Sequence, residues 1–403
     1  MPDTMHIIIK ASGKGRSIAV TADNKLMEYY VDKADESTLA GALVLGRVER
    51  VVPTMGAAFV NIGQAQNGFL PLDEMESFTK INQAASLASG QELIFQIKKD
   101  AKDQKGAFLT RDIALPGQYL IYMPLNRYVG VSKRIRDDHA RQKLLETGKA
   151  LCQDTFGLIM REASLLARTD MLYEELHELK ALWNTMQKSA EYAKAPTVLH
   201  RESVLAGLLR DYAQRYSIRI TCNDKVNRMP VPPTGIDWEQ VSDVQLEAQW
   251  KAYHVDSSVE EALGRRVMLK NGGTLMIDER EALSTVDVNT ASFVGDQQGD
   301  IALKQNLAAC HDIARQIRLR NLSGIIIIDF VDMPDEAQRA QVIQRLESEL
   351  SRERVKTVVH GFTSLGFLEM TRKRTGATLR DQLCAPCEKC HATGYRLERE
   401  RLS

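Results

Sequence analysis

Residues 271–333 decide the fold of this chain and read NGGTLMIDEREALSTVDVNTASFVGDQQGDIALKQNLAACHDIARQIRLRNLSGIIIIDFVDM. The stretch opens with two strand-like runs, at 274–278 and 282–288, which a short charged turn joins. Apolar residues then recur at helical spacing over 303–317. Four consecutive isoleucines follow at 325–328, and such a run is typical of a strand that is buried on both faces. The stretch therefore predicts three strands and one helix.

Acidic residues lie at the ends of two of these strands. Val286 and Val288 are expected on one face of their strand and Asp287 and Asn289 on the other, because strand side chains alternate. Asp329 ends the isoleucine strand. If the strands are neighbours, the two carboxylates meet at the sheet edge and repel unless a cation lies between them. Mg²⁺ needs only one or two carboxylates, and Asn289 can orient a water or a phosphate there. The alternative is that both acids are ordinary turn or cap residues.

Length and composition indicate a multidomain globular protein. The 403 residues are enough for roughly two to four domains. The formal net charge is zero, so a polyanion would have to be held by local basic patches. Three candidates are 133–136, 315–320 and 372–374, although each by itself is more typical of a solvated surface.

Targeting and membrane signals are not found in the sequence. The N-terminal MPDTMHIIIK lacks the long apolar region of a signal peptide, and no run approaches the length of a membrane span. Of the six cysteines three are scattered and three clustered, which is not a disulfide framework. We therefore expect a cytoplasmic protein that does not bind a membrane.

The N-terminal part of the chain is rich in short strands. Runs within 6–31 are too few to form a domain alone, so we expect them to pair with a later segment. Residues 39–118 form a compact β unit punctuated by Gly and Pro. Phe59 and Phe69 fall on strands that flank the turn at 63–68, where each is either a core residue or an exposed ring that stacks on bases.

Helices are expected in most of the remaining chain. Their predicted ranges are 137–155, 170–195, 203–215, 259–265 and 335–354. Further strands are expected at 218–222 and 355–360.

Residues 384–394 read CAPCEKCHATG. Close C-x-x-C spacing suits a tetrahedral Zn²⁺ ion, which needs four ligands. Either this chain supplies a fourth ligand, or two chains each give two cysteines. The alternative to zinc is a cluster of reduced or redox-active thiols.

Taken together, these motifs resemble the ribonuclease E/G family. The matching segments are GGTLMIDEREALSTVDVNT, NLAACHDIARQIRLRNLSGIIIIDFVDM and LGFLEMTRKR, and the resemblance runs from Met5 to Arg396. It implies an endoribonuclease, a hydrolase that cuts single-stranded RNA to 5′-phosphate and 3′-hydroxyl ends in rRNA maturation and mRNA turnover. Because the sequence ends soon afterwards, it resembles the ribonuclease G-like members that lack a scaffold tail. An RNA-binding factor of the same fold with weak or no cleavage is the alternative.

The resemblance also implies an α+β multidomain architecture. Its expected parts are an RNase H-like subdomain (1–36 and 196–267), an inserted S1 OB-fold RNA-binding domain (37–118), a 5′-sensor subdomain (119–195), a DNase I-like catalytic subdomain (268–383) and a zinc-link tail (384–403).

Functional residues follow from the resemblance position by position. It implies that Asp287 and Asp329 hold the catalytic Mg²⁺ with support from Asn289. It also implies that single-stranded RNA, from rRNA precursors and mRNA, contacts the barrel. The RNA-contacting residues are then Phe59, Phe69 and Lys105.

The 5′-sensor implied by the resemblance contains a pocket for a 5′-monophosphate. Its residues here are Gly130, Val131, Arg161 and Glu162. Family members carry Thr at the last of these positions. An ionised carboxylate has no donor and repels a phosphate, so we expect weaker preference for 5′-monophosphorylated RNA. We expect Glu162 either to point away or to pair with Arg161.

The tail resembles the family's zinc link, in which two protomers share one Zn²⁺. Cys387 and Cys390 align with the family's pair, and Cys384 is an additional candidate ligand. The resemblance therefore implies a homodimer or homotetramer held through a shared zinc.

Overall fold

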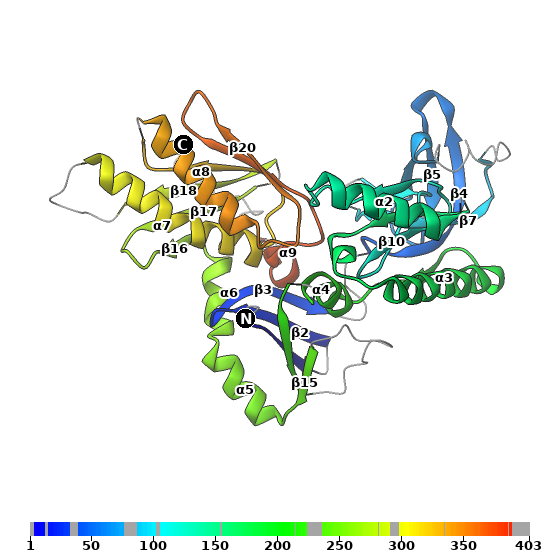
Figure 1. The fold of residues 1–403 in the computed structure, drawn as a ribbon, viewed down its shortest axis with the longest axis horizontal. Helices are drawn as coiled ribbons and strands as arrows, with labels where there is room; N and C mark the ends of the chain where they lie inside the picture. The colour runs from blue at the N-terminus through cyan, green and yellow to red at the C-terminus, as the bar shows by residue number, and fades with distance from the viewer. Residues whose placement is uncertain are drawn as a thin grey trace, which may run out of the picture. The chain divides into compact units, whose positions relative to one another are not determined.

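The structure is a computed structural model that describes residues 4–12, 15–32, 39–75, 87–101, 105–153, 155–213, 215–223, 236–280, 282–290, 298–333, 335–385 and 387–388. The chain divides into two compact units, both of mixed α and β structure (Figure 1). The first contains Met1–Glu36, Tyr216–Arg228 and Gly235–Ser403, and the second contains Ser37–Arg215 and Met229–Thr234.

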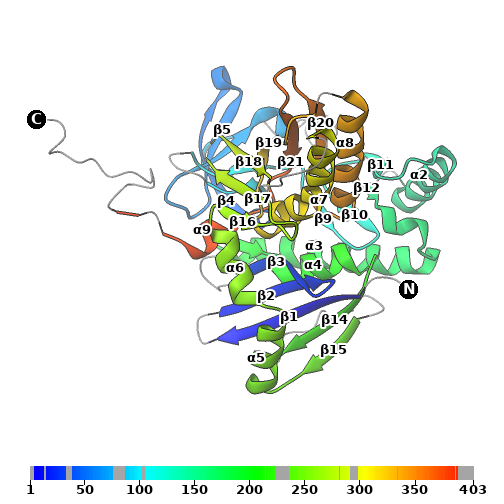
Figure 2. The same cartoon turned by 90° about the vertical axis from the view of Figure 1, so that its left-hand side faces the viewer.

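A five-stranded sheet in the first unit joins the N-terminal strands to a distant segment (Figure 2). Its order is β15-β14-β1-β2-β3. The strands are β1 (Thr4–Ser12), β2 (Gly15–Ala22), β3 (Lys25–Asp32), β14 (Ser217–Cys222) and β15 (Ile236–Gln240). Because β1 pairs in parallel with β14, the predicted pairing of the first strands with a later segment is confirmed.

Two consecutive helices pack on this sheet. They are α5 (Asp243–Ala252), which Ser242 and Gln245 start with a capping box, and α6 (Val255–Leu263). Trp250 and Val255 share a core with Ile8 and Leu26 of the sheet. The sequence interpretation missed α5 and began α6 at Val259, four residues late.

The deciding stretch forms most of a second sheet in the same unit, with order β16-β17-β18-β19-β21-β20. Its strands are β16 (Arg266–Met268), β17 (Thr274–Glu279), β18 (Leu283–Asn289), β19 (Gly324–Asp329), β20 (Thr357–Phe362) and β21 (Leu368–Arg372). Figure 1 shows α7 (Gln298–Leu319) beside α8 (Glu336–Leu350), and both share one core with the sheet.

The expectation that the isoleucine strand is buried on both faces is wrong. Ile326 and Ile328 are fully buried against the helices, but Ile325 is 49% exposed. The core of the described residues lies on the helix side of this sheet, so alternate isoleucines face away from it.

Buried charges connect the two sheets of the first unit. Arg318 of α7 lies 3.5 Å from Glu28 of β3, and Glu353 lies 3.3 Å from Arg372. All four residues are nearly inaccessible to solvent. The proposed basic patches at 315–320 and 372–374 are therefore partly structural, because ion pairs among buried side chains replace solvent there. Arg372 also donates to Asn321 Oδ1 over 2.7 Å, so it is neither a surface cation nor free to contact a phosphate.

The second unit contains a closed barrel of five strands, consistent with an OB-like fold. They are β4 (Leu43–Val52), β5 (Ala57–Asn61), β6 (Gly68–Pro71), β7 (Glu92–Lys99) and β8 (Phe108–Thr110). Pairing of β4 with β7 closes the barrel, and β13 (Thr197–His200) adds to β4 from outside. Val44, Val60, Leu70, Phe95 and Leu109 form its core.

A small sheet and three α-helices also belong to the described part of the second unit. The sheet order is β11-β12-β10-β9, with β9 (Leu115–Pro116), β10 (Leu120–Met123), β11 (Val129–Val131) and β12 (Gly157–Met160). The helices are α2 (Asp138–Cys152), α3 (Thr169–Tyr192) and α4 (Val204–Tyr212), close to their predicted ranges. Asp137 caps α2 and Ser203 caps α4, which explains where both helices begin.

Candidate active site

The register of the second sheet brings the two predicted acids together. Strands β18 and β19 are parallel neighbours, and Asp287 lies directly opposite Asp329 as the last pair of their ladder. Both side chains are exposed, whereas Val286 and Val288 are buried, as strand alternation predicted. The two carboxylates therefore share one exposed sheet edge.

Asn289 completes this arrangement. Its Nδ2 donates a hydrogen bond to Asp287 Oδ2 over 2.9 Å. The bond fixes one oxygen of the carboxylate and leaves the other available. The three residues predicted from the sequence thus lie at one strand end.

The electrostatics of this edge favour a cation. Partial burial, then the charges of Asp287 and Asp332, raise the pKa of Asp329 above its usual range. Asp332 was not among the predicted site residues. Within the described ranges no basic side chain forms an ion pair with Asp287 or Asp329, so their repulsion is not relieved by the protein there.

A hard divalent cation fits this donor set. Mg²⁺ characteristically takes one or two carboxylates and completes its shell with water and substrate phosphates. The described part of the chain has no cluster of three or more His, Cys, Asp or Glu that could enclose a metal. The residues present thus suit Mg²⁺ better than a metal that needs a full protein cage.

A row of three aromatic rings crosses one surface of the barrel. Phe59 of β5 lies opposite Phe69 of β6, which lies opposite Phe108 of β8, and neighbouring ring centroids are 6.0 Å apart. All three are half-buried, and the residues beside them in sequence, Val60 and Leu70 among them, form the core. Strand alternation therefore directs the rings outward, away from the core position that was the alternative.

Cations flank this row. Arg50 Cζ lies 5.4 Å from the Phe59 centroid, and Lys99 Nζ lies 5.5 Å from the Phe108 centroid. Lys105 is exposed three residues before Phe108. The sequence interpretation missed Phe108, Arg50 and Lys99; the alternation of the FLT strand could have indicated Phe108.

The four residues expected to form a phosphate pocket also lie together. Strand β11 runs parallel to β12, with Gly130 opposite Ile159 and Val131 opposite Met160. Arg161 and Glu162 follow β12 directly. The small sheet thus brings both pairs of residues to one strand end.

The charges of this pocket are paired within the protein, although not as expected. Arg161 Nη2 donates to Asp211 Oδ1 over 2.9 Å, and Arg215 Nη2 donates to Glu162 Oε2 over 2.6 Å. Glu162 therefore does not pair with Arg161, which was one of the two expected arrangements, and its partner is Arg215 instead. Burial, then repulsion from Arg215, lowers the pKa of a further neighbour, Arg134. No local sequence pattern points to Asp211 or Arg215, which are about 50 residues away along the chain.

Comparison with known proteins identifies the family. The family model described as "Ribonuclease E/G family" matches residues 114–375. This range includes Asp287 and Asp329 as well as Arg161 and Glu162. The chain belongs to the ribonuclease E/G family. Among its relatives, the "Ribonuclease G" proteins of Salmonella typhimurium and Escherichia coli are each 35% identical to it. In both cases the match covers 97% of this chain and 84% of the relative.

A longer relative is matched over a smaller share of its own length. The "Ribonuclease E" of Haemophilus influenzae is 32% identical over 99% of this chain but only 45% of its own length. Both kinds of relative thus match nearly all of this chain, but the ribonuclease G proteins are covered over most of their own length and the ribonuclease E over less than half. Among the described helices none is long and apolar enough to cross a bilayer.

Of the cysteine cluster, only Cys384 and Cys387 belong to the described part of the chain. Both are exposed and neither is in a disulfide. Cys390 lies outside the described residues. A metal ion can reach the two exposed thiols. Which cysteines bind zinc stays a prediction.

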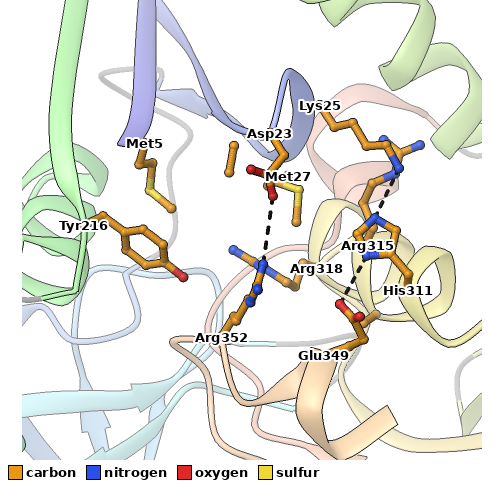
Figure 3. A pocket seen from close by; sticks show the side chains of 12 residues that line it. Met5, Asp23, Lys25, Met27, Tyr216, His311, Arg315, Arg318, Glu349 and Arg352 are labelled. Atoms are coloured by element: carbon orange, nitrogen blue, oxygen red, sulfur yellow. Dashed lines mark hydrogen bonds and ion pairs between the residues drawn. The ribbon is translucent and has the colours of Figure 1, made fainter. Parts of the chain in front are cut away.

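A small cavity in the first unit contains charged side chains but no predicted site residue (Figure 3). Lys25 Nζ lies 3.1 Å from His311 Nε2, and His311 Nδ1 lies 3.1 Å from Glu349 Oε2. Arg352 lies 3.9 Å from Asp23. These side chains contact one another. The cavity therefore lies within the packing between β2, β3, α7 and α8.

Proposed function

We propose that this protein is a Mg²⁺-dependent endoribonuclease that hydrolyses single-stranded RNA to products with 5′-phosphate and 3′-hydroxyl ends. The observation that carries the proposal is the pairing of Asp287 with Asp329 at the end of β18 and β19. Family membership and the names of the relatives, ribonucleases G and E, support the hydrolase activity. We further propose that it acts in the cytoplasm on rRNA precursors and mRNA.

Three residues of the candidate site would have separate roles in cleavage. Asp287 and Asp329 would hold the cation, and Asn289 would keep the Asp287 carboxylate in one orientation through its hydrogen bond. When bound, Mg²⁺ supplies stabilisation of the negative charge that develops on the scissile phosphate. Attack by water on phosphorus, with the 3′-oxygen leaving, gives the proposed product ends.

RNA would be retained by the barrel. Phe59 and Phe69, together with Phe108, present ring faces on which bases stack. Arg50 and Lys99 are cations beside these rings, and Lys105 is an exposed cation three residues before Phe108; all three suit backbone phosphates. Stacking tolerates any base, which agrees with the lack of a base-reading motif in the sequence.

The decisive test separates cleavage from binding. Asp287→Asn and Asp329→Asn should each reduce Mg²⁺-dependent cleavage about a thousandfold, because several kcal/mol of transition-state stabilisation is lost. RNA affinity should change little. Asp278→Asn is the matched control, since Asp278 lies on the neighbouring strand β17 but pairs with Arg265. Tight RNA binding by the wild type without cleavage would instead support an RNA-binding factor.

We also propose that Cys387 and Cys390 of two chains share one Zn²⁺, with homodimers or homotetramers as the result. The exposed Cys387 supports this, because an external ligand can reach it. Metal analysis should give one Zn²⁺ per two chains, and Cys387→Ala should lower the oligomeric order in light scattering. One Zn²⁺ per chain with unchanged assembly would instead indicate a closed site that uses Cys384.

A further inference from the structure

Two adjacent amide side chains of α7 contact the backbone beyond each acidic residue. Gln305 Nε2 donates to the carbonyl of Asn289 over 3.4 Å, and its Oε1 accepts from Asn271 Nδ2 over 2.6 Å. Asn306 Nδ2 donates to the carbonyl of Val331 over 2.8 Å, and its Oδ1 accepts from the Val331 N–H over 3.0 Å. One helix turn thus holds both strand ends.

Within the described residues, the backbone that Asn306 holds has no strand partner of its own. The ladder between β19 and β18 ends at Asp329, and the ladder between β19 and β21 ends at Ile328. Val331 therefore lies past both ladders. Asn306 supplies both hydrogen bonds that a neighbouring strand would otherwise provide.

Both amides are buried where a helix facing a core ordinarily carries apolar residues. Asn306 is 0% exposed and Gln305 is 5% exposed, whereas the next buried positions of α7 include Ala309, Cys310 and Ile313. A buried amide is costly unless its groups are hydrogen-bonded. Their hydrogen bonds to the two strand ends are what offsets that cost here.

A glycine makes room for one of these contacts. A Cβ atom at Gly273 would lie 2.0 Å from Gln305 Nε2 and 2.8 Å from the carbonyl oxygen of Asn289. Neither distance is compatible with a real side chain. Gly273 therefore allows Gln305 to reach the end of β18.

We propose that Asn306 and Gln305 are positioning residues that set the separation of the Asp287 and Asp329 carboxylates for the cation. Each amide fixes the backbone two residues beyond one acid, at Val331 or at Asn289. The inference rests on the proposed metal site and assigns its geometry to α7. Outer hydrogen bonds of this kind typically change metal affinity or activity by about 10- to 100-fold when removed.

The test compares two buried amides of the same helix. Asn306→Leu removes the contact to Val331. Gln316→Leu is the control, because Gln316 is also 0% exposed and, among the described residues, its side chain accepts a hydrogen bond from Arg320 just past the end of α7. Mn²⁺ binding to the full chain is measured by calorimetry, together with the Mg²⁺ dependence of kcat, the KM for RNA and the melting temperature. We expect Asn306→Leu to weaken Mn²⁺ binding about tenfold with an unchanged KM, and Gln316→Leu to leave metal affinity unchanged.

The outcomes distinguish this inference from the proposed function. Asp329→Asn is the reference: if it binds Mn²⁺ and cleaves RNA like the wild type, the metal site itself is wrong. If Asp329→Asn loses metal but Asn306→Leu matches Gln316→Leu in metal affinity and kcat, the positioning role is overturned. If Asn306→Leu does not fold, Gln305→Met decides. A loss of metal affinity of about fivefold, the worth of one hydrogen bond, supports the role, and no loss overturns it.

Discussion

The end of β18 and β19 and the end of β11 and β12 are built alike but hold their charges differently. Each is a pair of parallel strands with charged side chains at or just beyond its end. At the first, Asp287 and Asp329 face each other with like charge. At the second, Arg161 pairs with Asp211 and Glu162 with Arg215.

The difference bears on which of the two strand ends an external ion would stabilise. Partial burial, then the like charges of Asp287 and Asp332, raise the pKa of Asp329, and a cation bound there would relieve the repulsion. At the second site a phosphate would have to displace carboxylates that already neutralise the arginines. Similar pairs of parallel strands thus hold like charges side by side in one case and mainly paired opposite charges in the other.

Removing divalent metal should give the largest contrast between the two sites. With a chelator present, cleavage should fall about a thousandfold or more and return when Mg²⁺ is added back. RNA affinity should persist, because it depends on the barrel and on phosphate contacts. Gel-based cleavage and fluorescence anisotropy measure the two quantities. If cleavage is undiminished in the presence of chelator, the proposed cation at Asp287 and Asp329 is wrong.

Aromatic substitutions in the barrel should sharpen the comparison by separating RNA affinity from both charged sites. Phe59→Ala and Phe69→Ala should each weaken RNA binding by about 1–3 kcal/mol, through the loss of one stacked base. Binding should also weaken steeply with salt, because counterions are released from the phosphates. Tyr192→Ala is the control, since Tyr192 is an 89% exposed aromatic residue at the end of α3 and is not part of the row of three rings. Equal RNA affinity of all three folded variants would refute the stacking role.

Replacing Glu162 by threonine, which carries a neutral hydroxyl, should have the smallest effect of the three changes. Glu162→Thr breaks the pair with Arg215, which is partly exposed and worth up to about 1 kcal/mol. The wild type should distinguish 5′-monophosphate from 5′-hydroxyl RNA only weakly, and the variant should raise that ratio by about fivefold at most. Matched RNAs that differ only at the 5′ end measure it.

The control for this prediction is Asp170→Thr, which breaks an exposed pair with Arg168 and should leave the ratio unchanged. A large ratio in the wild type that Arg161→Ala abolishes would show that the pocket works despite its carboxylate. The contrast between the two strand ends would then fail.

The sequence by itself determined the local chemistry of the candidate site. Alternation in the strand containing Asp287 predicted that the carboxylate lies on one face and the two neighbouring valines on the other. Helical spacing predicted most of α7. Such periodic patterns are local, because each residue's face depends only on its neighbours. The sequence also put Phe59 and Phe69 on strands that flank one turn, but it could not say whether each ring lies in the core or on the surface of the barrel.

Only the tertiary structure decided which distant groups meet. The register that sets Asp287 against Asp329, the pairing of Glu162 with Arg215 and the contact of Asn306 with Val331 each join separate segments. The isoleucine run shows the limit clearly: it predicted a strand, but the one-sided packing of α7 and α8 decided that Ile325 stays exposed. Burial and charge pairing depend on what the rest of the chain brings to a residue, and no local pattern contains that information.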